Sequence, residues 1–266
     1  MHQAVNTNTE NANTENATIA KRRLMNASAK ANQEHTELTG YQGIGRLGEK
    51  TLHRIIKYYL EPDFSCHERA CGPFYADILN DRDELYEIQT RDFSRLRDKL
   101  KTWLPDRTVT IVYPIAFIKR ICWIDPLDGT ISQARKSPKQ GRWWDVLPEL
   151  YQIRPYLAHP NFRLNLIGLD LIEYRHKDGW AKNGKRGSSR YDRVPQNIMA
   201  ELSLAQTADY KALLPQSLPS PFTAKTFRQQ TRLSAYQSSL SLAVLRDLRV
   251  IRLVGKEGRA YLYKLS

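Results

Sequence analysis

Two acidic residues and an amide have a spacing that suits a metal-assisted reaction. Asp77 lies in the strand-like run FYADIL (74–79), and Glu87 and Gln89 lie in the run LYEIQT (85–90). Side chains alternate along a strand, so Glu87 and Gln89 are expected on one face. Carboxylates on adjacent strands can converge on Mg²⁺ or Mn²⁺, which would stabilise the charge of a phosphodiester under attack and activate water.

A third acid, Glu49, belongs to a predicted helix within residues 41–63 that Pro62 ends. The apolar residues that recur there at helical spacing are Leu52, Ile55, Ile56 and Tyr59. Glu49 precedes Leu52 and Ile56 by three and seven residues, so it is expected to project from the apolar face. A separate stripe of this helix is basic and consists of Lys50, Arg54 and Lys57.

The secondary structure expected around the acidic residues would determine their positions. The runs 74–79 and 85–90 indicate a β-hairpin that turns at NDRDE (80–84). A helix is expected over 92–105, capped by Asp92, and its apolar face is Phe93, Leu96, Leu100, Trp103 and Leu104. A β-branched run at 107–116 follows, as expected for a buried strand after a right-handed crossover. This order predicts an α/β fold with a mixed central sheet flanked by helices.

Further elements follow along the chain. Residues 119–141 indicate a second hairpin and 143–153 a short helix, and 162–175 indicate a long strand that is expected to extend the sheet. The segment 176–193 is rich in glycine and basic residues, so it is either a solvated loop or a loop that contacts phosphate.

The arrangement over residues 41–116 resembles the PD-(D/E)XK nuclease superfamily, which has the restriction-endonuclease-like fold. The resemblance depends on Glu49 in the helix, Asp77 in the first hairpin strand, and Glu87 and Gln89 in the second. It implies metal binding by Asp77 and Glu87, with Glu49 as an accessory ligand, and a catalytic group of Glu49, Asp77, Glu87 and Gln89. The implied cofactor is Mg²⁺ or Mn²⁺, and a homodimer is compatible with the resemblance because many such enzymes act as dimers.

This chain departs from the family at Gln89, where members usually have a lysine. An amide can position water or phosphate by hydrogen bonding, but it cannot supply the charge of an ammonium. Arg95 and Lys99, one turn apart on the next predicted helix, are the candidates for the missing cation. The alternative is an ordinary solvated hairpin, because surface hairpins are often rich in Asp and Glu.

The C-terminal segment predicts a winged helix. After the linker PQSLPSP (215–221), helices are expected over 222–234 and 235–248, followed by a hairpin that turns at GKEG (255–258). Residues at the start of the second helix and at the wing are candidates to contact nucleic acid: Ser234, Tyr236, Gln237, Ser238, Lys256 and Arg259. Winged helices also bind proteins, so the pattern alone leaves this alternative open.

These observations divide the chain into three parts. Residues 1–36 are rich in Asn, Thr and Glu with the near-repeat NTENANTENA, which predicts a disordered tail. A nuclease-like α/β domain is expected over 37–213 and a small winged-helix domain over 214–266.

Composition constrains the partners and the compartment. Lys and Arg outnumber Asp and Glu by 41 to 28, and the net charge of +13 favours a polyanion such as nucleic acid. Three cysteines, an odd number, suit a reducing cytoplasm, and neither a signal peptide nor a membrane-spanning run is seen. CHERAC (66–71) has zinc-ligand residues but no second ligand pair nearby.

The sequence therefore predicts a cytoplasmic, Mg²⁺-dependent endodeoxyribonuclease whose winged helix helps to hold DNA. Two other classes stay open: a catalytically inactive nuclease-like protein that binds or regulates DNA, and an interaction scaffold without nucleic acid. The pattern does not separate DNA from RNA as substrate.

Overall fold

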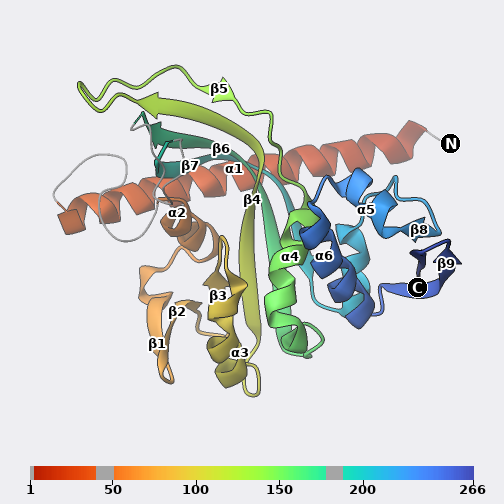
Figure 1. The fold of residues 1–266 in the computed structure, drawn as a ribbon. Helices are drawn as coiled ribbons and strands as arrows, with labels where there is room; N and C mark the ends of the chain where they lie inside the picture. Colours follow the sequence, from red (N-terminus) through yellow and green to blue (C-terminus); the bar gives the residue numbers. More distant parts are fainter. Residues whose placement is uncertain (1–2, 40–50, 178–187) are drawn as a thin grey trace. The chain divides into compact units, whose positions relative to one another are not determined.

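The structure is a computed structural model that describes residues 3–39, 51–177 and 188–266, with side chains in the first range described for 17–37. Over these residues the larger sheet contains seven strands: β1 (His67–Cys71), β2 (Phe74–Leu79), β3 (Leu85–Ile88), β4 (Val109–Ile124), β5 (Arg135–Lys136), β6 (Phe162–His176) and β7 (Arg190–Leu204). Their order is β1-β2-β3-β4-β6-β7, with β5 paired to β4 (Figure 1). The pair β2/β3 is antiparallel and β3/β4 is parallel, so the sheet is mixed, as predicted.

Helices flank this sheet, and a smaller sheet lies near the C-terminus of the chain. The helices are α1 (Gln3–Thr39), α2 (Thr51–Leu60), α3 (Arg97–Trp103), α4 (Leu147–Leu150), α5 (Ala224–Thr231) and α6 (Ala235–Asp247). The smaller sheet has the order β8-β10-β9 and consists of β8 (Phe222–Thr223), β9 (Ile251–Glu257) and β10 (Ala260–Leu265). Of the helices described, none has the length and apolar character needed to cross a membrane.

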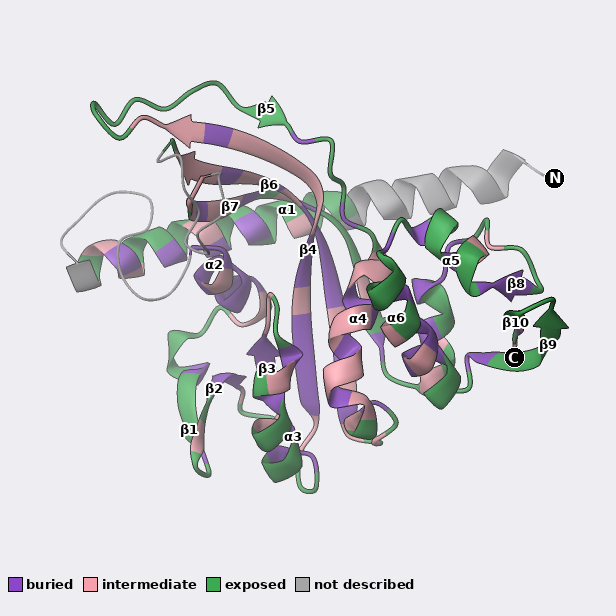
Figure 2. Cartoon of the chain, viewed as in Figure 1, coloured by how far each residue is buried: buried purple, intermediate pink, exposed green. Residues whose placement is uncertain are grey.

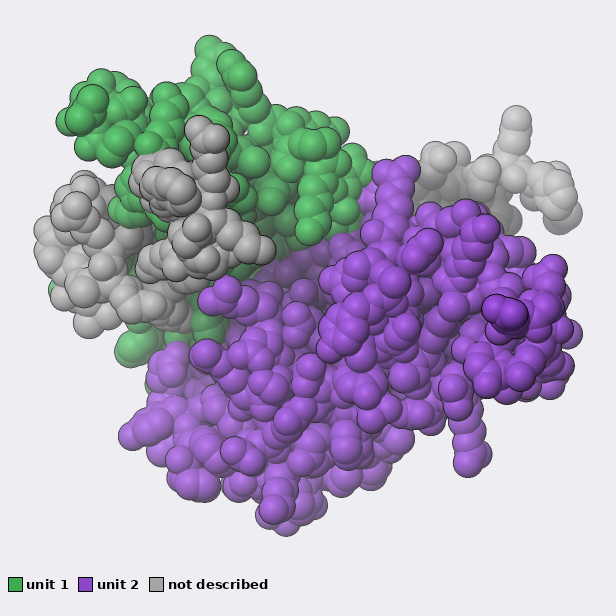
Figure 3. All heavy atoms as spheres, in the orientation of Figure 1, with its two compact units in different colours: residues 1–67, 116–141, 167–201 green, residues 68–115, 142–166, 202–266 purple. Residues whose placement is uncertain are grey.

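The chain forms two compact units that are built from interleaved segments (Figure 3). Unit 1 comprises residues 1–67, 116–141 and 167–201, and unit 2 comprises 68–115, 142–166 and 202–266. These units differ from the consecutive ranges predicted from the sequence, 37–213 and 214–266, because β4 and β6 each contribute residues to both.

In unit 1, α1 takes the place of the disordered tail expected over residues 1–36. Leu24, Ala27 and Ala31 are buried at helical spacing, and this part of the chain packs against α2. Arg23 adds a hydrogen bond from Nη2 to the carbonyl oxygen of Tyr59 over 2.8 Å. The apolar stripe of Leu24, Ala27 and Ala31 thus packs against α2. The mostly polar composition of residues 1–36 does not reveal this stripe.

In unit 2, the predicted hairpin and the helix after it are confirmed. β2 pairs with β3 in the register Ile78↔Tyr86 and Leu79↔Leu85. The helix expected over 92–105 consists of a 3-10 turn, Phe93–Leu96, followed by α3, and the predicted apolar residues are buried. Asp92 makes no side-chain cap of this helix, since its carboxylate accepts from Ser94 Oγ and Arg95 Nε instead.

The part of β4 that lies in unit 2 is a buried strand, as its apolar run predicts. Figure 2 shows the burial along β4, where Val109, Ile111 and Val112 are each 0% exposed. β3 and β4 are parallel and are joined through α3, which is the crossover expected from the order of the elements.

Strand β7 was not predicted from the sequence. The basic segment 176–193 was expected to be a loop; residues 178–187 lie outside the described residues, and β7 begins at Arg190. Along β7 the buried positions do not alternate, and Pro195 lies inside the strand. Both features argue against a strand when only the sequence is read.

Gly168 is predicted to be intolerant of a side chain. A Cβ atom at this position in β6 would lie 2.7 Å from a ring carbon of Phe117 in the neighbouring strand β4. Gly168→Ala should therefore lower the free energy of unfolding by about 1–3 kcal/mol, measured by urea denaturation. In a Phe117→Leu background the same change should cost less, because the ring is gone. Equal costs in the two backgrounds would show that this contact does not restrict position 168.

Candidate functional site

The hairpin in unit 2 brings Asp77 and Glu87 together. The register Ile78↔Tyr86 places these two acids opposite each other when it is continued by one step. Both are buried: Asp77 is 8% exposed and Glu87 is 7% exposed. The paired residues end at Ile78↔Tyr86, so the hairpin places the two acids at neighbouring positions of adjacent strands, and both are largely withdrawn from water.

Asp77 is fixed by the backbone of the neighbouring strand. Its Oδ2 accepts a hydrogen bond from the backbone N–H of Ile88 over 2.6 Å. The N–H groups of Leu85 and Gln89 donate to the backbone of residues 108 and 112 at the β4 side, so the N–H of Ile88 faces β2. A carboxylate therefore takes the place that a backbone carbonyl of β2 would fill, which sets the position of Asp77 at the end of the paired segment.

Lys99 of α3 supplies a cation next to Glu87. Its Nζ lies 2.5 Å from Glu87 Oε1 and donates to the carbonyl oxygen of Tyr75 over 3.0 Å. The ammonium group also lies 5.4 Å from the centre of the Trp103 ring. The helix is held by its buried residues Leu100 and Trp103, so the lysine is presented by a packed element and not by a loop.

The ion pair of Glu87 and Lys99, together with Asp77 on the adjacent strand, is hereafter the Asp77–Glu87–Lys99 cluster. Two carboxylates supply hard oxygen ligands of the kind that Mg²⁺ and Mn²⁺ accept. One ammonium lies beside Glu87, and it comes from α3 and not from position 89, where the resemblance to nucleases expects a lysine. The cluster can hold a cation through its carboxylates, and its lysine can neutralise charge on an anion that approaches the same edge.

Gln89 and Arg95 point to other partners. Gln89 Nε2 donates to the carbonyl oxygen of Asp92 over 3.0 Å, so its amide stabilises the loop that follows β3. Arg95 Nε lies 3.1 Å from Asp92 Oδ2, and the side chain is 80% exposed. Of the two candidate cations in the sequence, the structure therefore brings Lys99 to the acids.

Glu49, the third predicted ligand, lies outside the described residues. In the part of the chain that is described, no group of three or more His, Cys, Asp and Glu side chains is placed to hold a metal ion. Asp77 and Glu87 are thus the predicted ligands that the structure brings together.

The residues predicted to contact nucleic acid fall into two groups. At the start of α6, Ser234 Oγ accepts from the N–H of Gln237, and Gln237 Oε1 accepts from the N–H of Ser234. This reciprocal pair is a capping box, so both side chains serve the helix end. Ser238 is buried at 3% exposure and is not available at the surface, which corrects its predicted role. Helical periodicity explains the error, because Ser238 falls on the same face as Leu242 and Leu245.

The other predicted contact residues are exposed. Tyr236 is 72% exposed at the start of α6. Lys256 and Arg259 lie at the turn between β9 and β10, where Lys256 Nζ stands 5.1 Å from the centre of the Tyr261 ring. These side chains are accessible to a partner.

Comparison with known proteins identifies relatives of this chain. A family model described as "Domain of unknown function (DUF8091)" matches residues 50–205. A protein of Treponema pallidum (strain Nichols), described as an uncharacterized protein, is 28% identical over 172 residues, which cover 64% of this chain and 66% of that protein. The chain thus matches just under two thirds of that relative's length. No solved structure gives a match.

The ion pair within the cluster is predicted to be strongly coupled. A double-mutant cycle of Glu87→Gln and Lys99→Met should give a coupling energy of about 1–3 kcal/mol in urea unfolding, because both groups are largely buried. The matched control is the exposed pair, Asp92→Asn with Arg95→Met, for which about 0.5 kcal/mol or less is expected. A coupling energy for Glu87 and Lys99 no larger than the control value would contradict this geometry.

Proposed function

The chain belongs to the DUF8091 family, and we propose that it is a metal-dependent phosphodiester hydrolase, a nuclease that acts on DNA. The observation that carries the proposal is the Asp77–Glu87–Lys99 cluster, in which two buried carboxylates lie on adjacent strands and one of them, Glu87, pairs with an ammonium group. The family match supplies no activity, so the proposal depends on the chemistry of these side chains.

The order of the elements around the cluster supports a restriction-endonuclease-like core. The helix α2, the hairpin β2/β3, the helix α3 and the parallel strand β4 follow one another as the resemblance expects. The two acids lie in the hairpin strands, and the next helix carries the lysine. Glu49 is retained in the proposal as an accessory acid on the basis of the sequence alone.

Each residue of the cluster has a distinct role in the proposed reaction. Asp77 and Glu87 would hold a divalent cation, which when bound supplies charge stabilisation for the phosphate and activates water. The hydrogen bond from Ile88 orients Asp77 before the substrate arrives. Lys99 would stabilise the negative charge that develops on the phosphate oxygens, as a strand lysine would in the family that the sequence resembles. The proposed metal ion would bind the Glu87 carboxylate together with Asp77, in competition with Lys99.

A winged-helix module over residues 214–266 is the second part of the proposal. Its support is the order β8-α5-α6-β9-β10 and the strand order β8-β10-β9 of the small sheet. Tyr236 near the start of α6, together with Lys256 and Arg259 at the wing, would contact DNA, mainly through phosphate. The net charge of +13 favours the same partner.

One observation favours the alternative of a catalytically inactive nuclease-like protein that binds or regulates DNA. Lys99 lies only 2.5 Å from Glu87, so the ammonium competes with a metal ion for that carboxylate. In this alternative the ion pair stabilises the hairpin and the protein binds DNA without cutting it. The two functions separate in a cleavage assay.

Cleavage of DNA should depend on the two acids. Purified protein with plasmid and Mg²⁺ or Mn²⁺ should give nicked or linear products, and Asp77→Asn or Glu87→Gln should lower the rate by about a hundredfold or more. The matched control is Asp98→Asn, which removes an exposed carboxylate next to Lys99. Cleavage that survives Asp77→Asn would reject this site, and intact DNA binding without cleavage would establish the alternative.

DNA binding should depend on the wing. The double variant Lys256→Ala/Arg259→Ala should reduce the slope of log affinity against log salt by about 2, as expected for the loss of two phosphate contacts. This slope is measured by fluorescence anisotropy with a labelled duplex at several salt concentrations. Lys21→Ala/Arg22→Ala removes the same charge from an exposed part of α1 and serves as the control. An equal change in both double variants would mean that charge alone acts, without a wing contact.

A further inference from the structure

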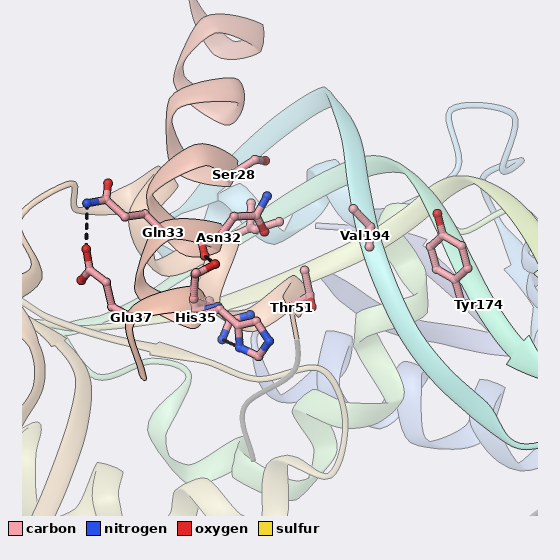
Figure 4. A pocket seen from close by; sticks show the side chains of 11 residues that line it. Ser28, Asn32, Gln33, His35, Glu37, Thr51, Tyr174 and Val194 are labelled. Atoms are coloured by element: carbon pink, nitrogen blue, oxygen red, sulfur yellow. Dashed lines mark hydrogen bonds between the residues drawn. The ribbon is translucent and has the colours of Figure 1, made fainter. Parts of the chain in front are cut away.

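Unit 1 contains a cavity of about 710 Å³ whose lining residues come from α1, α2, β6 and β7. Figure 4 shows it with Asn32 and His35 of α1 on one side, Thr51 of α2 beside His35, and Val194 and Tyr174 of the two strands on the other side. Cavities of this size hold ligands as large as a mononucleotide. The cavity shares no residue with the Asp77–Glu87–Lys99 cluster.

The chemical feature of this cavity is Arg54 of α2. Its side chain lines the cavity although the residue is only 5% exposed. Its Nη1 lies 3.3 Å from Nδ1 of His35, and its Nε is buried with no hydrogen-bond acceptor among the described residues. Within the same described part of the chain, no Asp or Glu forms a salt bridge with it.

A guanidinium in this setting favours an anionic partner. Arginine stays charged in proteins, and burying its charge without a carboxylate is costly. His35, the contact of this guanidinium, carries no negative charge that could neutralise it. Among the described residues, no carboxylate pairs directly with Arg54, and Asp192, an acid of this region, accepts from Thr51 instead.

The rest of the lining suits a phosphate with an organic body. Ser28, Thr36 and Thr51 bring hydroxyl groups to the lining. Thr36 Oγ1 donates to the carbonyl oxygen of Asn32 over 2.9 Å, and Thr51 Oγ1 donates to Oδ2 of the buried Asp192 over 2.5 Å. Either hydroxyl would therefore donate to a phosphate oxygen only by giving up that bond. Ile55 and Val194 give the cavity an apolar wall. The acid of the lining, Glu37, is exposed and accepts from Gln33 Nε2 over 2.9 Å, whereas Arg54 is buried. Within the lining, the guanidinium is thus buried and the carboxylate of Glu37 is exposed.

We propose that this cavity binds a small organic phosphate of about mononucleotide size, with the phosphate on Arg54 and the organic part against the Ile55 and Val194 wall. The proposal goes beyond the nuclease function and does not depend on it. It adds a small-molecule site to unit 1, whereas the nuclease proposal concerns side chains of unit 2 and the phosphate backbone of a polymer.

Thermal unfolding with defined probes tests the proposal. Adenosine monophosphate at saturating concentration should raise Tm by about 5 °C or more, inorganic phosphate should raise it less, and adenosine should leave it unchanged. Stabilisation by succinate but not by either phosphate compound would overturn the assignment to phosphate. No stabilisation by the nucleotide or by inorganic phosphate would overturn the proposal.

Variants distinguish whether Arg54 binds the ligand or only stabilises the fold. Arg54→Met should abolish the rise in Tm while leaving the unliganded protein at least as stable as the wild type, because it removes a buried charge without a partner. Val194→Phe fills the cavity from the strand side and should weaken nucleotide binding at least tenfold with Arg54 in place. Arg22→Met, which removes an exposed guanidinium from α1, is the control and should bind normally. A strongly destabilised Arg54→Met protein, or normal nucleotide binding in Val194→Phe, would assign Arg54 a structural role and overturn the site.

Discussion

The proposed nuclease site depends on one hydrogen bond, in which Asp77 Oδ2 accepts from the backbone N–H of Ile88 over 2.6 Å. Strand β3 has one N–H that faces β2 at this point, and a side chain satisfies it in place of a backbone carbonyl. The same bond fixes the Asp77 carboxylate between β2 and β3, at the residue that follows Glu87. The Asp77 carboxylate thus completes the hydrogen bonding of β3 and is also positioned for the proposed metal binding.

The second constraint is electrostatic, since two buried carboxylates side by side repel each other unless a cation joins them. Lys99 supplies one positive charge, and it reaches Glu87 because Leu100 and Trp103 pack α3 beside the hairpin. A divalent ion would supply more. The contrast between the nuclease and the inactive DNA-binding alternative is therefore a competition between an ammonium group and a metal ion for Glu87.

The sequence predicted correctly those elements that show a local periodicity. It did not predict structure or burial that depends on contacts with residues distant in the chain. The β2/β3 hairpin and α3 follow from alternation, turn residues and a helical apolar face. The tail over 1–36 contains few apolar residues, yet Leu24 and its neighbours find a surface on α2. Ser238 and Arg54 look like surface residues by type, but both are buried, at 3% and 5% exposure. Polar residues of these types are usually exposed, so the sequence suggests a surface position. Packing within the fold buries both side chains.

A metal ion bound between Asp77 and Glu87 would be the most direct sign of the proposed nuclease site. Crystals grown or soaked with Mn²⁺ and measured for anomalous scattering should show a peak within about 2.0–2.6 Å of one oxygen of Asp77 and one of Glu87. Loss of that peak in crystals of Asp77→Asn would confirm the ligand. Crystals with Mn²⁺ present that show no peak between these two carboxylates, and Lys99 still on Glu87, would contradict the central claim.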